Sequence, residues 1–145
     1  PMKNKKVKIA IVEDDSSQNK VLTNYVSAIC EDKAYENVKF DIKSYTKAQQ
    51  CIMDLENDLD IILIDYYLLL IGDPDVLTGE DIVDCVKSFC PSCDIVMISS
   101  QEDKKMLTKL IRKGITEYID KNKNLINRVE SVVQRLLLRR ELSAA

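Results

Sequence analysis

Apolar residues follow two alternating patterns along the chain, namely short runs rich in Ile and Val, and longer stretches with helical spacing. The short runs predict five strands, at residues 7–12, 38–43, 61–64, 94–98 and 116–119. Residues 61–64 are apolar at every position, as in a central strand that is covered on both faces. Residues 38–43 alternate between apolar and polar, which is typical of an edge strand.

The stretches between the strands predict helices. The clearest one carries an apolar stripe over residues 125–137, with Arg139 and Arg140 near its end, where the helix dipole favours positive charge. Gly114 marks the end of the preceding helix. Thr46 with Gln49 predicts a capping box at the start of another helix.

The predicted order is therefore strand then helix, five times over. Such alternation predicts an α/β, doubly wound parallel sheet with helices on both faces. Ligand sites in such folds lie at the carboxyl ends of the strands. We expect one domain over residues 6–140, with tails at 1–5 and 141–145, and we interpret Pro1, which precedes Met2, as a cloning remnant.

Composition narrows the chemistry. The chain has 145 residues, 46% of them hydrophobic, a formal net charge of −3 and no histidine. This apolar fraction is enough for a sizeable core. Because these 145 residues include no histidine, they cannot form a Ser-His-Asp or Cys-His catalytic site or a His-ligated zinc site. The mild acidity, with no basic patch, disfavours nucleic acid as a direct partner.

No membrane association is expected. The longest apolar run, residues 61–71, is interrupted by Asp65 and is shorter than the roughly 20 residues that a bilayer requires. The first residues lack the apolar stretch of a signal peptide. We therefore expect a cytoplasmic protein.

Five cysteines include a CxxC pair, Cys90 and Cys93. A zinc site would need two further good ligands, and no second CxxC is present. A thioredoxin-like motif would open a helix, whereas this pair lies between a predicted helix and a strand. We interpret the pair as a turn whose thiols pack as small apolar groups.

Polar residues follow the predicted strands where a site would lie. Glu13, Asp14 and Asp15 follow the first strand, Asp65 the third, Ser99 the fourth and Lys121 the fifth. Clustered carboxylates repel one another and therefore need a cation. Mg²⁺ suits oxygen ligands, and a lysine with a hydroxyl would complete a pocket for a phosphoryl group.

The segments 11–15, 62–65, 96–100 and 114–121 together closely resemble the receiver domains of two-component response regulators. The resemblance runs from about Lys6 to Leu137. It implies a CheY-like, flavodoxin-like sheet of five parallel strands in the order 2-1-3-4-5, with five helices. Each motif alone is weak, and the order of all four carries the resemblance.

The resemblance also implies roles for individual residues. Asp65 would be the phosphoacceptor. Glu13, Asp14, Asp65 and the backbone carbonyl of Tyr67 would bind Mg²⁺, for which Mn²⁺ could substitute.

Three further roles follow by position. Lys121 would pair with the phosphoryl oxygens, Ser99 would hydrogen-bond to them after transfer, and Tyr118 would be the aromatic switch that moves with Ser99. The donor would be a sensor histidine kinase or a histidine phosphotransfer protein. A downstream protein or a second copy of the chain would bind region 103–137, and the chain would not be an enzyme beyond transferring and losing its own phosphoryl group.

Other interpretations remain open. Asp14 and Asp15 could be helix-capping acids, and Ser99, Lys121 and Tyr118 could each have an ordinary structural role. The chain could be a receiver-like interaction module that is not phosphorylated. A phosphatase with an aspartate nucleophile is less favoured, because that class has a second Asp where Tyr67 stands.

The sequence departs from the family in two places. Asn122 follows Lys121 where the family usually has a proline after a cis peptide bond, so we expect either a trans bond with a reshaped loop or a strained cis bond. Gly79 lies fourteen residues after Asp65, instead of about eight, which indicates an insertion within residues 69–78.

Overall fold

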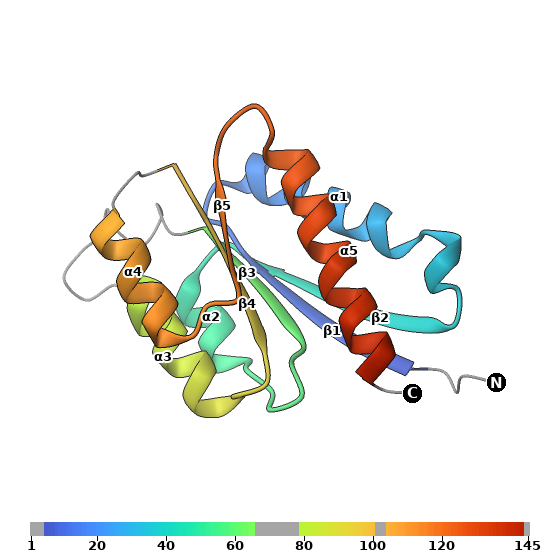
Figure 1. Cartoon of the computed structure of the whole chain (residues 1–145), viewed down its shortest axis with the longest axis horizontal. Helices are drawn as coiled ribbons and strands as arrows, with labels where there is room; N and C mark the ends of the chain where they lie inside the picture. The colour runs from blue at the N-terminus through green and yellow to red at the C-terminus, as the bar shows by residue number, and fades with distance from the viewer. Residues whose placement is uncertain (1–4, 66–78, 101–103, 144–145) are drawn as a thin grey trace.

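The computed structural model describes residues 5–65, 79–100 and 104–143, with side chains described up to residue 140. Figure 1 shows that strands and helices alternate along these ranges. The strands are β1 (Lys5–Val12), β2 (Val38–Tyr45), β3 (Ile61–Asp65), β4 (Asp94–Ser99) and β5 (Glu117–Asp120). The helices are α1 (Ser16–Cys30), α2 (Ala48–Met53), α3 (Gly79–Phe89), α4 (Lys104–Lys113) and α5 (Leu125–Ser143), and a short 3₁₀ helix, η1 (Lys33–Tyr35), follows α1.

The five strands form one parallel sheet in the order β2-β1-β3-β4-β5. The predicted α/β fold, with this strand order and five helices, is confirmed. β3 lies at the centre, and all five of its residues are buried. β2 is an edge strand, as its alternating pattern predicts.

Helices cover both faces of the sheet, with α1 and α5 on one face and α2, α3 and α4 on the other (Figure 1). Successive side chains of a strand point to opposite faces. Ile62 and Ile64 therefore pack toward α2 and α3, whereas Ile61 and Leu63 pack toward α1 and α5. Apolar residues are needed on both faces, which explains the unbroken apolar run before Asp65.

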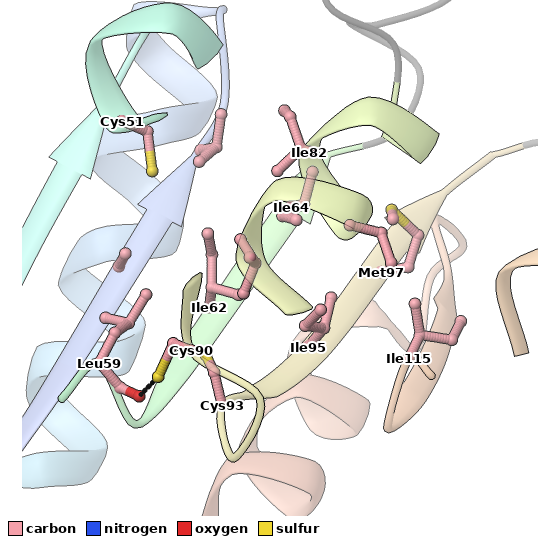
Figure 2. Packing of buried hydrophobic residues seen from close by; sticks show 14 of the residues in the cluster. Cys51, Leu59, Ile62, Ile64, Ile82, Cys90, Cys93, Ile95, Met97 and Ile115 are labelled. Atoms are coloured by element: carbon pink, nitrogen blue, oxygen red, sulfur yellow. Dashed lines mark hydrogen bonds between the residues drawn. The ribbon is translucent and has the colours of Figure 1, made fainter. Parts of the chain in front are cut away.

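The CxxC pair lies inside the core on the α2–α4 face (Figure 2). The Cys90 thiol donates a hydrogen bond to the carbonyl oxygen of Leu59 at 3.1 Å, and Cys93 is 1% exposed. Burial raises the pKa of the Cys93 thiol, which keeps it protonated. Both thiols are free, so the interpretation as core residues is confirmed.

Of the two helix boundaries predicted above, the structure confirms the C-terminal glycine and not the capping box. Gly114 follows α4 with φ of 103°, and its N–H donates to the carbonyl of Leu110 at 3.1 Å, as a C-terminal glycine does. The capping box at Thr46 is wrong. The chain is still extended at Lys47, which stands before α2 without a side-chain capping bond, so the helix begins beyond the reach of Thr46.

No helix in the described part of the chain is both long and apolar enough to cross a membrane.

Candidate functional site

The register of the strands brings the predicted site residues to one edge of the sheet. Val12 lies beside Ile64, so Glu13 and Asp65 follow at the same level of neighbouring strands. Asp65 lies beside Ile98, and Ser99 lies beside Asp120, the residue before Lys121. Parallel strands thus place side chains that are far apart in sequence at a single carboxyl edge.

The three acids after β1 have different environments. Asp15 is the N-cap of α1, because its carboxylate accepts a hydrogen bond from the Gln18 N–H at 2.9 Å. Glu13 is buried, with 4% of its surface exposed, whereas Asp14 is exposed. The capping interpretation therefore holds for Asp15 and leaves Glu13 and Asp14 as candidate ligands.

Asp65 and Lys121 form an ion pair between Asp65 Oδ2 and Lys121 Nζ. Asp65 is 3% exposed and the Lys121 side chain 22% exposed. The same ammonium lies 3.6 Å from Glu13 Oε1. A buried carboxylate is stable only with such partners, so one lysine from the β5–α5 loop serves two acids from other strands.

The proximity of the two buried acids alters the ionisation of Glu13. Burial, together with hydrogen bonding to Asp65 and its negative charge, raises the pKa of Glu13 to about 8. The N–H of Asp15, which donates to Glu13 Oε2 at 3.3 Å, and the charge of Lys121 oppose the increase. With Glu13 protonated, Lys121 balances the charge of Asp65, whereas ionisation of both acids would leave one negative charge that Lys121 does not neutralise.

Ser99 and Tyr118 lie on the neighbouring strands β4 and β5. Ser99 is 2% exposed, and its carbonyl oxygen accepts a hydrogen bond from the Lys121 N–H at 2.9 Å. Tyr118 is half-buried and packs against the core on the α2–α4 face. Ser99 and Lys121 are thus joined through the backbone at the same edge as Asp65.

The loop that carries Lys121 is built around Asn122. The peptide bond between them is trans, which decides between the two alternatives stated above. The Asn122 N–H donates to the carbonyl of Asp120 at 3.0 Å, and its side-chain oxygen accepts from the Asn124 N–H at 2.8 Å. Proline could make neither bond. Asparagine thus supplies a turn of a different kind that still directs Lys121 to Asp65.

Tyr67, the predicted insertion at 69–78 and residue 103 lie outside the described residues.

A pocket of about 270 Å³ opens beside the acids. Glu13, Asp65 and Lys121 line one part of it, and the remaining lining comes from β4 and from the first turns of α1 and α5, namely Ser17, Gln18, Val21, Leu22, Ile98, Leu125 and Ile126. The carboxylate of Asp65 is therefore reached through a cavity with largely apolar walls.

No group of three Cys, Asp or Glu side chains within the described ranges is placed to hold a metal ion by itself. Mg²⁺ keeps several waters and commonly uses only one or two carboxylates. Glu13 and Asp65 supply two adjacent carboxylates whose mutual repulsion a cation would relieve. The residues present therefore fit a hydrated divalent cation.

One buried polar residue near the site was not anticipated from the sequence. Asn19 is 5% exposed and bonds to the backbone of residues 13–15, the loop after β1 that is called the acid loop below. A signal existed, because Asn19 falls three residues before Leu22 on the otherwise apolar face of α1. A polar residue in such a stripe needs internal partners.

Comparisons with known proteins agree with this architecture. No family model and no curated protein matches the sequence. The solved structures that resemble the chain include receiver domains, and each of three examples is matched over nearly its whole length.

The first example is a response regulator receiver domain protein from Clostridium thermocellum, with a TM-score of 0.71, 15% identity and coverage of 94% of this chain and 98% of that one. The HemR receiver domain from Leptospira biflexa has a TM-score of 0.68 and 15% identity, and the match covers 90% of this chain and 93% of that one. A CheY-like receiver domain protein from Methanospirillum hungatei has a TM-score of 0.64 and 17% identity, and the match covers 93% of this chain and 97% of that one. The chain has the receiver fold, and the predicted resemblance is confirmed at that level.

Proposed function

We propose that residues 6–140 form a response-regulator receiver that accepts a phosphoryl group on Asp65. The observation that carries the proposal is the buried Asp65 carboxylate at the end of the central strand, paired with Lys121 and adjacent to Glu13. A purely structural acid at this position would not need a second acid beside it, since the pair is costly. The receiver fold of the structural neighbours supports the same conclusion.

The donor is the phosphohistidine of a sensor histidine kinase or of a histidine phosphotransfer protein, because this chain has no histidine. An Asp65 oxygen forms a bond to phosphorus while the phosphorus–nitrogen bond breaks, and the electron pair of that bond stays on the imidazole. The pocket beside Asp65 provides access. The chain transfers a phosphoryl group to itself and does not turn over an external substrate.

Glu13, Asp14, Asp65 and the carbonyl of Tyr67 would hold Mg²⁺, or Mn²⁺ in its place. The ion would supply positive charge that offsets the negative charge of these carboxylates and of the phosphoryl group. Lys121, which contacts both Glu13 and Asp65, would pair with a phosphoryl oxygen once Asp65 is phosphorylated.

Ser99 and Tyr118 form the proposed switch. The Ser99 hydroxyl hydrogen-bonds to the phosphoryl group, and Tyr118 moves with it. The response reaches a downstream protein, or a second copy of the chain, through region 103–137. The site is proposed to work in the cytoplasm, where a kinase would supply the phosphoryl group.

The decisive experiment is incubation with acetyl phosphate and Mg²⁺, followed by intact-mass measurement. The wild type should gain one base-labile phosphoryl group. Asp65→Asn should gain none, and the matched control Asp58→Asn, which makes the same change at an exposed acid far from the site, should behave as the wild type. Chelation of the divalent cation should abolish the adduct.

Absence of an Asp65-dependent adduct would contradict the proposal. It would favour the alternative, in which the chain is a receiver-like interaction module that is not phosphorylated.

A further inference from the structure

Asn19 joins three parts of the molecule at the acid loop. It lies in the first turns of α1 and is 5% exposed. Its side-chain nitrogen donates hydrogen bonds to the carbonyl of Glu13 at 3.0 Å and to the carbonyl of Tyr45 at 3.1 Å. One amide group thus holds the residue after β1 and the last residue of β2.

Thr23, one turn further along α1, determines which way this amide points. The Thr23 hydroxyl donates to the side-chain oxygen of Asn19 at 3.2 Å. Because that oxygen must face Thr23, the two N–H groups of Asn19 face the two carbonyls. Each polar atom of the Asn19 side chain therefore has a partner.

The backbone of Glu13 is held on both sides. Its N–H donates to the carbonyl of Tyr45 at 3.0 Å, and its own carbonyl accepts from Asn19. The carboxylate of the same residue is one of the two buried acids beside Lys121. The Asn19 amide therefore helps to hold the backbone from which the Glu13 carboxylate projects.

A simple need to satisfy a polar side chain does not account for this arrangement. A leucine at position 19 would continue the apolar face of α1 toward Leu22 and would need no partner. The two carbonyls that Asn19 bonds belong to a strand-to-helix turn and to the end of an edge strand, and the Tyr45 carbonyl also accepts from the Glu13 N–H, so Asn19 adds a second tie between the same two segments. Without Asn19, the Glu13 backbone would be held to β2 by its N–H bond to Tyr45 alone.

We propose that Asn19, oriented by Thr23, is a positioning residue for divalent-cation binding at Glu13 and Asp65. This inference rests on the proposed function and goes beyond it, because Asn19 touches neither the phosphoryl group nor the ion. Removing an outer-shell partner of a metal ligand typically lowers metal affinity about 10–100-fold. The Asn19 bond acts on a ligand's backbone, so the lower end of that range applies.

The test compares four variants in the whole chain by titration calorimetry with Mg²⁺. Asn19→Leu removes both N–H donors and should weaken Mg²⁺ binding about tenfold. Thr23→Val removes the orienting hydroxyl and should weaken binding less, while Thr23→Ser keeps the hydroxyl and should restore it. Thr108→Val makes the same change on α4, where the hydroxyl bonds only to its own helix, and should leave the affinity unchanged.

Two further measurements separate positioning from general loss of structure. Hydrogen exchange of the Glu13 amide, measured without metal, should accelerate in Asn19→Leu and in Thr23→Val relative to core amides of β3. In phosphorylation by acetyl phosphate, the Mg²⁺ concentration for half-maximal rate should rise more than the maximal rate falls.

Wild-type Mg²⁺ affinity in Asn19→Leu would overturn the inference, and so would equal affinities in Thr23→Val and Thr23→Ser if Asn19→Leu does not fold. If the wild type binds Mg²⁺ and is phosphorylated on Asp65 while the Asn19 and Thr23 variants match it, the proposed function stands and this inference fails. A wild type that binds no Mg²⁺ and takes no phosphoryl group would overturn both.

Discussion

The two ends of the β-sheet carry acidic residues in opposite situations. At the amino end, Asp60 and Asp94 face the Arg140 guanidinium, with Arg140 Nη1 2.8 Å from Asp60 Oδ1 and Arg140 Nε 3.0 Å from Asp94 Oδ2. At the carboxyl end, Asp65 and Glu13 lie together and share the single ammonium of Lys121. Arg139 also bonds to Asp94, at 2.9 Å, so two acids meet two guanidinium groups at the amino end and a single ammonium at the carboxyl end.

The difference indicates which end is structural. Arg140 also donates to the carbonyl of Ser92 at 2.8 Å, so its planar group is bonded along several edges, and the end of α5 is fastened to the sheet. At the carboxyl end the pKa of Glu13 is raised to about 8, because the carboxyl group is buried and lies beside Asp65. The bonds of Arg140 at the amino end therefore stabilise the fold, whereas the acids at the carboxyl end are the ones that fit a divalent cation.

The largest expected effect is at the amino end. Arg140→Met leaves Asp60 and Asp94 partly buried without their shared partner and should lower the free energy of unfolding by about 3 kcal/mol. Arg139→Met is the matched control. Its guanidinium also bonds to Asp94, at 2.9 Å, but is 60% exposed, so its loss should cost less than about 1 kcal/mol. Urea unfolding measures both, and equal losses would show that the amino end is not fastened through Arg140.

An intermediate effect, of opposite sign, is expected at the carboxyl end. Because the folded state keeps the Glu13 proton up to a pKa of about 8, whereas the unfolded chain loses it near its ordinary value, stability should fall as pH rises between these values. Glu13→Gln removes the charge and should therefore be more stable than the wild type at pH 8 without divalent cations.

Unfolding of Glu13→Gln and the wild type at several pH values checks this prediction. The gap should close toward pH 4, where Glu13 is protonated in both states, and Mg²⁺ should narrow it at pH 8 by stabilising the wild type more. A gap that is independent of pH would mean that the charge of Glu13 is not the cause.

The smallest effect concerns the loop that presents Lys121. Asn122→Pro removes the N–H that donates to Asp120 and also the side-chain oxygen that accepts from Asn124, and it should cost about 1 kcal/mol. Asn122→Ala removes only the second bond and should cost less. Unfolding experiments compare the two, and a more stable Asn122→Pro would show that the family's usual proline also suits this loop.

Much of the fold was predictable because it depends on local patterns. The unbroken apolar run 61–64 requires cover on both faces, and the alternation at 38–43 requires one exposed face, so the central and edge strands could be assigned before the structure was known. The capping box at Thr46 failed because the extended chain continues through Lys47, which no local motif reveals.

The candidate site was predictable in composition and less so in its interactions. Glu13, Asp65, Ser99 and Lys121 follow strand ends, and a parallel sheet gathers strand ends at one edge. Which acid after β1 caps a helix is a different question, because Asp14 and Asp15 have the same chemistry and differ only in their position relative to the first turn of α1.

The sequence by itself therefore determined the order of the elements, the two-sided sheet and the residue types at its carboxyl edge, since these depend on periodicity and on neighbours in the chain. Only the tertiary structure decided that Lys121 pairs with Asp65 across a turn with a trans bond before Asn122, that Asp15 rather than Asp14 caps α1, and that Asn19 holds the acid loop. These depend on hydrogen-bond geometry and burial between segments that are far apart in sequence, which no local pattern contains.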